Sequence, residues 1–165
     1  MDAIDVVREW KRRMQERAFD GLGDVVDLDG YTEICLGLTP WTVGFQVALA
    51  NYVKNMVRPW GDLESVDEQV IAGPDAVVVR GHTTATHVGE FLGVAPTGRR
   101  IRWDWIAVVQ VRDGRVVGQW AQPDLFAIYR QIDDRDIAAA PLDASLRAAP
   151  PWAFPVPVPG LGRGL

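Results

Sequence analysis

The feature that most constrains the fold is a change in hydrophobic period near residue 60. Before it, apolar residues recur at steps of three and four, which places them on one face of a helix: Ile4, Val6, Val7, Trp10, Met14 and Ala18. After it, long runs rich in β-branched residues are typical of strands. Helices followed by consecutive strands predict an α+β fold with an antiparallel sheet.

Two helices and one short strand are predicted ahead of this change. The first helix spans residues 3–19, and a glycine-rich segment ends it. A short helical turn and a short strand near Tyr31–Leu36 follow. Thr39 as N-cap and Pro40 in the first turn then predict a second helix, with Trp41 to Val57 as its body.

Four strands and a closing helix are predicted in the second half. Asp113-Gly114 favours a tight hairpin turn between the last two strands, and Leu125–Ile132 reads as a short helix. We therefore predict one domain over residues 1–132. Residues 133–165, rich in Pro, Ala and Gly, form a tail without a core of its own. We expect Trp152 and Phe154 of this tail to cover a partner subunit. The predicted strands cover residues 65–73, 75–93, 99–114 and 115–124.

The composition limits the partners. A formal net charge of −5 argues against nucleic acids and anionic membranes as binding partners. No apolar run reaches the about 18 residues that a membrane helix needs. The first residues lack the basic start and apolar stretch of a signal peptide. Cys35 is the single cysteine, so no disulfide can form within the chain. Together these features predict a cytoplasmic protein.

The predicted strand over residues 101–111 has one wholly apolar face. Its odd positions are all apolar, whereas its even positions mix Asp104 and Gln110 with Arg, Ile and Val. Since successive side chains point to opposite faces of a sheet, the odd face must be covered. The even face predicts the wall of a cavity. Trp120 and Asp124, four residues apart on the next strand, share one face.

Several motifs resemble those of the SnoaL-like polyketide cyclases, within the nuclear-transport-factor-two-like superfamily. The resemblance covers residues 63–132 well, is weaker over the helices and is absent from the tail. The matching residues are Thr86-His87-x-Gly89-x-Phe91-x-Gly93, Pro96-Thr97-Gly98-Arg99, Asp113-Gly114-Arg115-Val116, Trp120 with Asp124, and Gln131. Pro96-Thr97-Gly98 would fix a turn between two strands that line one cavity.

The resemblance implies a cone-shaped fold in which a curved antiparallel sheet packs on the N-terminal helices around an apolar cavity. It also implies a hydrophobic, polyketide-like small molecule as substrate, and a reaction without a cofactor. Subunits of such proteins usually pair through the outer face of the sheet, so we expect a homodimer or a higher homo-oligomer. The apolar odd face of residues 101–111 is then expected to be buried against a second subunit.

Asp124 is the first candidate for an acid/base. The resemblance implies this role for an aspartate in a Trp-x-x-x-Asp setting. In an apolar pocket the carboxyl would have a raised pKa and could take up and return a proton. The local sequence supports an alternative, in which Asp124 caps the helix that begins at Leu125. One carboxylate cannot fully serve both roles at once.

His87 and Asp104 are further catalytic candidates. His87 could polarise a substrate carbonyl, or could simply pack beside the turn. Asp104 could pair with Asp124, and separated pKa values would suit epoxide opening or dehydration; alternatively it is an exposed charge. His82 and His87 lie five residues apart and therefore on opposite faces, so we expect no shared metal ion.

The candidates for substrate binding are mostly aromatic. Gln110 stands where several cyclases carry a histidine, and an amide can hydrogen-bond a carbonyl but cannot titrate. Aromatic side chains could line a flat pocket or could be ordinary core. Cys35 is expected to be a small buried residue and not a nucleophile. The aromatic candidates are Trp41, Phe45, Tyr52, Trp105 and Trp120.

Three functions remain open from the sequence. The first is a cyclase of natural-product biosynthesis that closes a ring by acid/base chemistry, such as an intramolecular aldol condensation. The second is epoxide opening, dehydration or isomerisation by two carboxylates in the same pocket. The third is a non-catalytic small-molecule binding or accessory protein.

Overall fold

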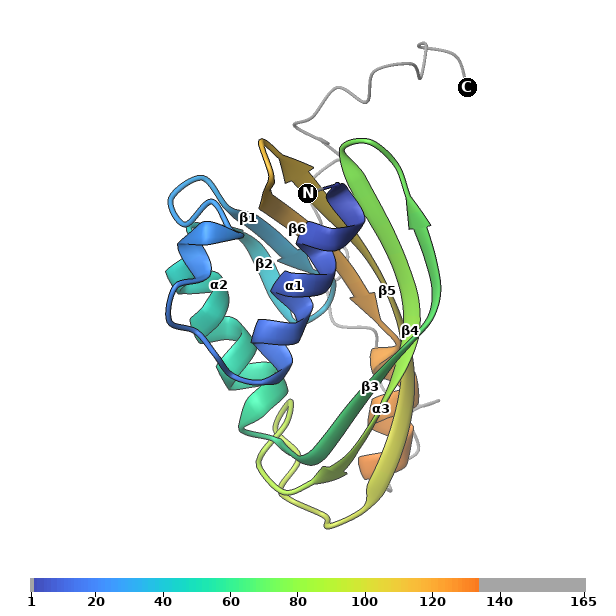
Figure 1. Cartoon of the computed structure of the whole chain (residues 1–165). Helices are drawn as coiled ribbons and strands as arrows, with labels where there is room; N and C mark the ends of the chain where they lie inside the picture. The colour runs from blue at the N-terminus through green and yellow to red at the C-terminus, as the bar shows by residue number, and fades with distance from the viewer. Residues whose placement is uncertain (1, 134–165) are drawn as a thin grey trace, which may run out of the picture. The chain divides into compact units, whose positions relative to one another are not determined.

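The computed structural model describes residues 2–133, and these form a six-stranded curved sheet with helices packed on it (Figure 1). The predicted α+β class and curved sheet are confirmed. The strand order is β2-β1-β6-β5-β4-β3. The elements are α1 (Ala3–Gln15), η1 (Leu22–Asp24), β1 (Thr32–Cys35), β2 (Thr39–Val43), α2 (Phe45–Tyr52), η2 (Val53–Val57), β3 (Trp60–Ala72), β4 (Ala76–His87), β5 (Arg100–Arg112), β6 (Arg115–Pro123) and α3 (Leu125–Ile132).

The sheet is mixed, whereas an antiparallel sheet was expected. Neighbouring strands run antiparallel except β1 and β6, which run parallel with Glu33 opposite Gln119. A parallel pair needs a long crossover connection. Here α2 and strands β2 to β5 lie between the two paired strands in the sequence, so the chain has ample length for it.

The first helix has its predicted apolar stripe but ends earlier than residue 19. The carboxylate of Asp2 accepts a hydrogen bond from the backbone N–H of Asp5 at 3.0 Å and caps the N-terminus. α1 ends at Gln15, and Arg17 has a positive φ of 56°, which is incompatible with a continuing helix. The side chains that α1 buries are Val6, Val7, Trp10 and Met14.

The second helix begins later than predicted. Thr39–Val43 forms β2, which pairs with β1, and not the start of a helix. The edge of β1 offers backbone partners to this segment, and that pairing outweighs the local helix-start signal of Thr39-Pro40. The turn into α2 is made by Gly44, whose φ of 89° suits a glycine and whose N–H donates to the Tyr31 carbonyl at 2.8 Å.

The predicted strands in the second half are confirmed, with shifted ends. β3 starts at Trp60 and so is longer than the predicted strand, and β4 ends at His87. Asp113 and Gly114 both have positive φ angles, 50° and 72°, and form the expected hairpin turn between β5 and β6. None of the helices within residues 2–133 is long and apolar enough to cross a membrane.

The odd face of β5 is covered by helices of the same chain, so the expectation of a second subunit on this face is wrong. At one end, Val109 and Val111 pack in one cluster with Val6, Trp10 and other side chains of α1. At the other end, Ile101 and Trp103 pack with two isoleucines of α3. Figure 1 shows α1 and α2 on the inner side of the curved sheet. The predicted tail contacts of Trp152 and Phe154 lie outside the described residues.

Candidate functional site

A cavity of about 210 Å³ lies between the helices and the inner face of the sheet. Its walls come from α1, α2, η2 and all six strands. Phe45, Tyr52 and Trp105, three of the aromatic residues proposed to bind substrate, contribute to its lining. Most of the other lining side chains are also apolar, and they include Trp10, Met14, Leu49, Met56, Trp103, Ala107 and Val109.

One carboxylate lines this cavity among the residues that the structure describes, and it belongs to Glu33 of β1. The register of β1 and β6 places Glu33 next to Gln119, which also faces the cavity. The hydroxyl of Tyr31 donates a hydrogen bond to Oε2 of Glu33 at 3.1 Å. Tyr31 is itself fully buried, with its ring edge-on to Phe45 at 5.2 Å.

Burial changes the acidity of the groups on this wall. It raises the pKa of Glu33, because the charged carboxylate loses solvation, and the hydrogen bond from Tyr31 offsets this only in part. It also raises the pKa of Tyr31 well above its usual range, so the phenol stays protonated and donates. Burial raises the pKa of Cys35 to about 12, with the nearby Glu33 adding to the effect. Cys35 therefore lacks the thiolate that a nucleophile needs.

The part of the wall formed by β3, β4 and β5 carries a short chain of polar contacts. The hydroxyls of Ser65 and Thr83 lie 2.7 Å apart, and the indole N–H of Trp105 donates to Thr83 Oγ1 at 3.0 Å. Lys11 lies 4.9 Å from the centre of the Trp105 ring and forms an ion pair with Asp67. The one cationic side chain of the described lining is therefore already paired.

A turn of π-helix, η2, follows α2 and contributes Asn55 and Met56 to the cavity. Such turns are rare and occur often at functional sites. The amides of Asn51 and Asn55 donate to the hydroxyls of Thr42 and Thr39 at 3.5 and 3.4 Å. These contacts tie the helical wall of the cavity to β2.

Asp124 lies outside the cavity, so the prediction that its carboxyl sits in an apolar pocket is wrong. Its side chain is exposed and accepts a hydrogen bond from the Ala127 N–H at 2.9 Å, as the N-cap of α3. The alternative role, helix capping, is thereby confirmed. The residue lies where the chain leaves the sheet, and a carboxylate there satisfies a free N–H of the first helical turn.

The faces of β5 are the reverse of those predicted. Its odd residues from Trp103 to Val109 line the cavity, whereas Asp104 and Gln110 lie on the outer face of the sheet. The side chain of Asp104 is 59% exposed, and one of its oxygens lies 3.3 Å from Arg102 Nη2. Trp120 stands opposite Val108 on this same outer face. An Asp104–Asp124 pair therefore does not meet inside the cavity.

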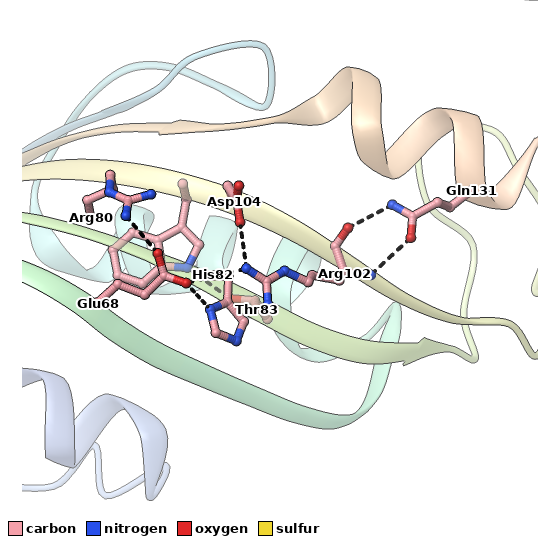
Figure 2. A network of polar contacts seen from close by, with 8 residues as sticks. Glu68, Arg80, His82, Thr83, Arg102, Asp104 and Gln131 are labelled. Atoms are coloured by element: carbon pink, nitrogen blue, oxygen red, sulfur yellow. Dashed lines mark hydrogen bonds and ion pairs between the residues drawn. The ribbon is translucent and has the colours of Figure 1, made fainter.

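The outer face instead carries an ionic network around Glu68 of β3 (Figure 2). Glu68 lies 2.9 Å from Arg80, 2.7 Å from the ring of His82 and 3.3 Å from Arg102. The hydrogen bond with His82 and the two nearby guanidinium groups lower the pKa of Glu68. This network is half-exposed and lies on the side of the sheet away from the cavity.

His87 and Trp41 do not line the cavity either. His87 is fully buried, with Nδ1 3.1 Å from Thr97 Oγ1 and its ring 5.2 Å from that of Trp60. Burial lowers the pKa of His87, and the carbonyl of Gly89 offsets part of this effect. The histidine therefore packs beside the Pro96-Thr97-Gly98 turn, as in the alternative left open above. Trp41 is 49% exposed on β2.

A family model described as SnoaL-like polyketide cyclase matches residues 4–132. The chain belongs to the SnoaL-like polyketide cyclase family. A search of curated protein sequences found no match. No group of three or more His, Cys, Asp or Glu side chains within residues 2–133 is arranged to hold a metal ion.

Solved structures of SnoaL-like and related proteins share the fold. A SnoaL-like polyketide cyclase from Agrobacterium tumefaciens is 21% identical, with a TM-score of 0.65, over 81% of this chain and 99% of the other. An NTF2-like protein from Burkholderia thailandensis is 12% identical, with a TM-score of 0.64, over 81% and 98%. An LEH-like epoxide hydrolase from M. tuberculosis is 17% identical, with a TM-score of 0.59, over 79% and 88%. The same fold thus occurs in proteins named for different reactions.

Glu33 is the main candidate residue of this SnoaL-like protein that the sequence analysis missed. The strand near Tyr31–Leu36 was predicted, without a cavity-facing side. Tyr31, Glu33 and Cys35 alternate along it, and this period places the carboxyl on the same side as two residues that are commonly buried. A single acid among such neighbours was the available signal.

Proposed function

We propose that this protein is a cyclase that closes a carbon ring in a polyketide-type substrate by acid/base chemistry, with Glu33 as the acid and base. The observation that carries the proposal is the Glu33 carboxyl in an apolar cavity, with a pKa raised by burial. Membership of the SnoaL-like family supports the substrate class. The likeness to structures below 25% identity supports the fold and not the reaction.

An intramolecular aldol reaction needs only what this cavity offers. Ionised Glu33 takes a proton from a carbon that lies between two substrate carbonyl groups. The resulting enolate carbon forms a bond to the carbon of a further carbonyl group of the same molecule, distinct from the two that flank it. The electron pair of the attacked C=O π bond moves to its oxygen. The proton held by Glu33 then returns to this oxygen, so the product is an isomer of the substrate. A carboxyl whose pKa lies closer to neutral pH is better suited to both transfers.

The remaining rate acceleration comes from the shape of the cavity. Aromatic walls such as Phe45 and Trp105 hold the planar part of the substrate, and a folded substrate brings its two reacting carbons together. Holding two reacting groups in a productive geometry lowers the entropic part of the barrier. Exclusion of water also protects the enolate from protonation by solvent.

The test compares Glu33→Gln with Asp124→Asn, because the acid/base role of Asp124 stays a prediction from the family resemblance. Both changes replace a carboxyl by an amide of similar size, and Asn remains a favoured N-cap for α3. Purified proteins are incubated with aromatic polyketide esters that carry an open β-keto side chain, and ring closure is followed by chromatography and mass spectrometry. We expect Glu33→Gln to lower turnover by roughly 10²–10⁴-fold and Asp124→Asn to leave it nearly unchanged.

Other outcomes of this experiment point to other functions. Loss of turnover in Asp124→Asn alone would assign the chemistry to Asp124. Binding of the esters by the wild-type protein without conversion would favour the accessory binding protein. The two-carboxylate reaction by Asp104 and Asp124 has no support in the geometry, since neither side chain lines the cavity.

We also propose that the protein forms a homodimer through the outer face of the sheet. Paired strands place Ile71, Val78, Val108 and Trp120 in one row across β3, β4, β5 and β6. Ile71 is 57% exposed in this row. An apolar row of this kind, bordered by the Glu68 network, suits burial against a second copy. The cytoplasmic location stays a prediction.

A further inference from the structure

The cavity contains a side-chain amide that the fold leaves without a hydrogen bond. Gln119 of β6 is half-buried and lines the cavity. It stands opposite Val109 of β5 and beside Glu33 of β1, and both of these residues line the cavity as well. Directly paired residues of neighbouring strands share one face of a sheet, so the register agrees with an inward side chain. Within residues 2–133 the amide of Gln119 forms no hydrogen bond.

This amide is accessible to a ligand. In the described part of the chain, the polar side-chain atoms that are both buried and unpaired are Trp10 Nε1 and His87 Nε2. The two amide atoms of Gln119 are not among them, so both atoms keep accessible surface. β6 lies inside the sheet, between β1 and β5, and an inward side chain there is exposed to the cavity.

Several other donors of the lining already have acceptors within the chain. The hydroxyl of Tyr31 donates to Glu33, and the indole of Trp105 donates to Thr83. The two asparagine amides on the helical wall donate to threonine hydroxyls of β2. Gln119 differs from these groups, because its N–H groups remain available for an acceptor that the free chain does not supply.

The charges in the cavity indicate which acceptor suits Gln119. Lys11, the one cationic side chain of the described lining, is paired with Asp67, so it does not balance an anionic ligand. Glu33 repels an anion whenever it is ionised. A neutral oxygen with lone pairs and no hydrogen of its own, such as a keto oxygen, satisfies the amide N–H without adding charge.

We propose that Gln119 is a substrate-binding residue whose side-chain amide donates a hydrogen bond to a keto oxygen of the ligand. The proposal rests on the proposed function for the choice of a ketone, but the contact does not require Glu33 to move a proton. Because Gln119 and Glu33 are neighbours across two strands, a carbon next to the bound carbonyl lies beside the carboxyl. Removal of a proton from this carbon places negative charge on the keto oxygen, where an N–H donor stabilises it.

The test uses two probes of nearly the same shape, 2-acetylnaphthalene and 2-isopropenylnaphthalene, in which C=O is replaced by C=CH₂. Dissociation constants for both are measured with the wild-type protein and with Gln119→Met, which keeps the length of the side chain and removes the amide. Gln122→Met, at an exposed position of the same strand, is the matched control. We expect Gln119→Met to lower the affinity for the ketone, relative to that for the alkene, by roughly 3- to 10-fold. Gln122→Met leaves this ratio unchanged.

A second readout reports on the hydrogen bond itself in the wild-type protein. The side-chain NH₂ signals of Gln119 are assigned from triple-resonance NMR spectra and are absent in Gln119→Met. We expect one of the two protons to move downfield on addition of the ketone and not on addition of the alkene. Binding of the alkene to Gln119→Met, with an affinity near that of the wild type, checks that the variant keeps its fold and its cavity.

Three results would overturn the proposal. They are an unchanged affinity ratio in Gln119→Met, amide signals of Gln119 that respond equally to both probes, and failure of the wild-type protein to bind the ketone up to its solubility limit. If Gln119→Met binds neither probe, the NMR comparison in the wild-type protein decides. These measurements need no turnover, so a failure here is distinguishable from an unchanged turnover in Glu33→Gln, which would contradict the proposed cyclase.

Discussion

At the scale of single residues, environment and not residue type separates two carboxylates. Asp124 is exposed at the start of α3, where it accepts the Ala127 N–H and stabilises the helix. Glu33 lines the largely apolar cavity, where burial makes ionisation cost solvation. The buried position of Glu33 favours the neutral form. A carboxyl that must both take up and release protons is better placed there.

The raised pKa of Glu33 predicts a specific pH dependence of stability. The native state binds this proton more tightly than the unfolded chain, whose pKa is near 4.5. The stabilisation is therefore complete below about that pH, and it is lost as the pH rises through the pKa of the folded state. In Glu33→Gln this contribution disappears, since the amide does not titrate.

The measurement is the free energy of unfolding in urea, at several pH values above and below 4.5. We expect the wild-type protein to lose stability relative to Glu33→Gln as the pH rises. Glu64→Gln, at an exposed position of β3, serves as control. We expect its free energy of unfolding to change with pH in parallel with that of the wild type. Parallel curves for wild type and Glu33→Gln would contradict the raised pKa.

At the scale of elements, a side chain of α3 completes the edge of β5. β6 pairs with β5 only from Trp105 onwards, so the first residues of β5 have no strand beside them on that side. The amide of Gln131 fills this place, because it accepts from the Arg102 N–H at 3.1 Å and donates to the Arg102 carbonyl at 2.7 Å (Figure 2). The sequence motif containing Gln131 thus has a structural role.

Gln131→Ala is expected to destabilise the fold by about 1 kcal/mol. The variant removes both hydrogen bonds to Arg102, and the loss stays modest because this edge is exposed and water can replace part of it. Gln122→Ala, at an exposed position of β6, is the matched control and should change little. Thermal unfolding of both variants checks this. Equal stabilities would show that the contact at β5 contributes nothing.

At the scale of the whole molecule, the two faces of the sheet differ in what they contact and in which side chains they carry. The inner face, together with α1 and α2, forms the cavity and the core. The outer face carries the Glu68 network and the apolar row of Ile71, Val78, Val108 and Trp120. A site enclosed by one chain does not need a partner for its walls, so pairing through the outer face would leave the cavity unchanged.

The dimer proposal predicts that Val108→Glu is monomeric. A carboxylate in the middle of the apolar row would be buried without a partner in the interface, which is costly. Val47→Glu, at an exposed valine of α2, is the control and should stay dimeric. Sedimentation velocity measures the mass of each. A monomeric wild-type protein, or a dimeric Val108→Glu, would rule out this interface.

The sequence by itself determined the kinds of element and their order except at β2, which was predicted as the start of a helix. Hydrophobic period distinguished the helical first part from the strands, Asp113-Gly114 located a hairpin, and the Asp124 cap was visible as an alternative. These features depend on contacts between residues close in the chain, so local rules suffice. The motifs from Thr86 to Gln131 also carried the family resemblance, which the match over residues 4–132 confirms.

Only the tertiary structure decided which face of each strand looks inward. Alternation shows that the two faces of β5 differ, but it does not say which one meets the helices. Both faces contain apolar residues, and the choice depends on where α1 and α2 pack. As a result of this packing, Asp104, Gln110 and Trp120 lie on the outer face. Glu33 lines the cavity, and it belongs to β1, which pairs in parallel with β6. Contacts between segments so far apart in the chain are set by packing of the whole core.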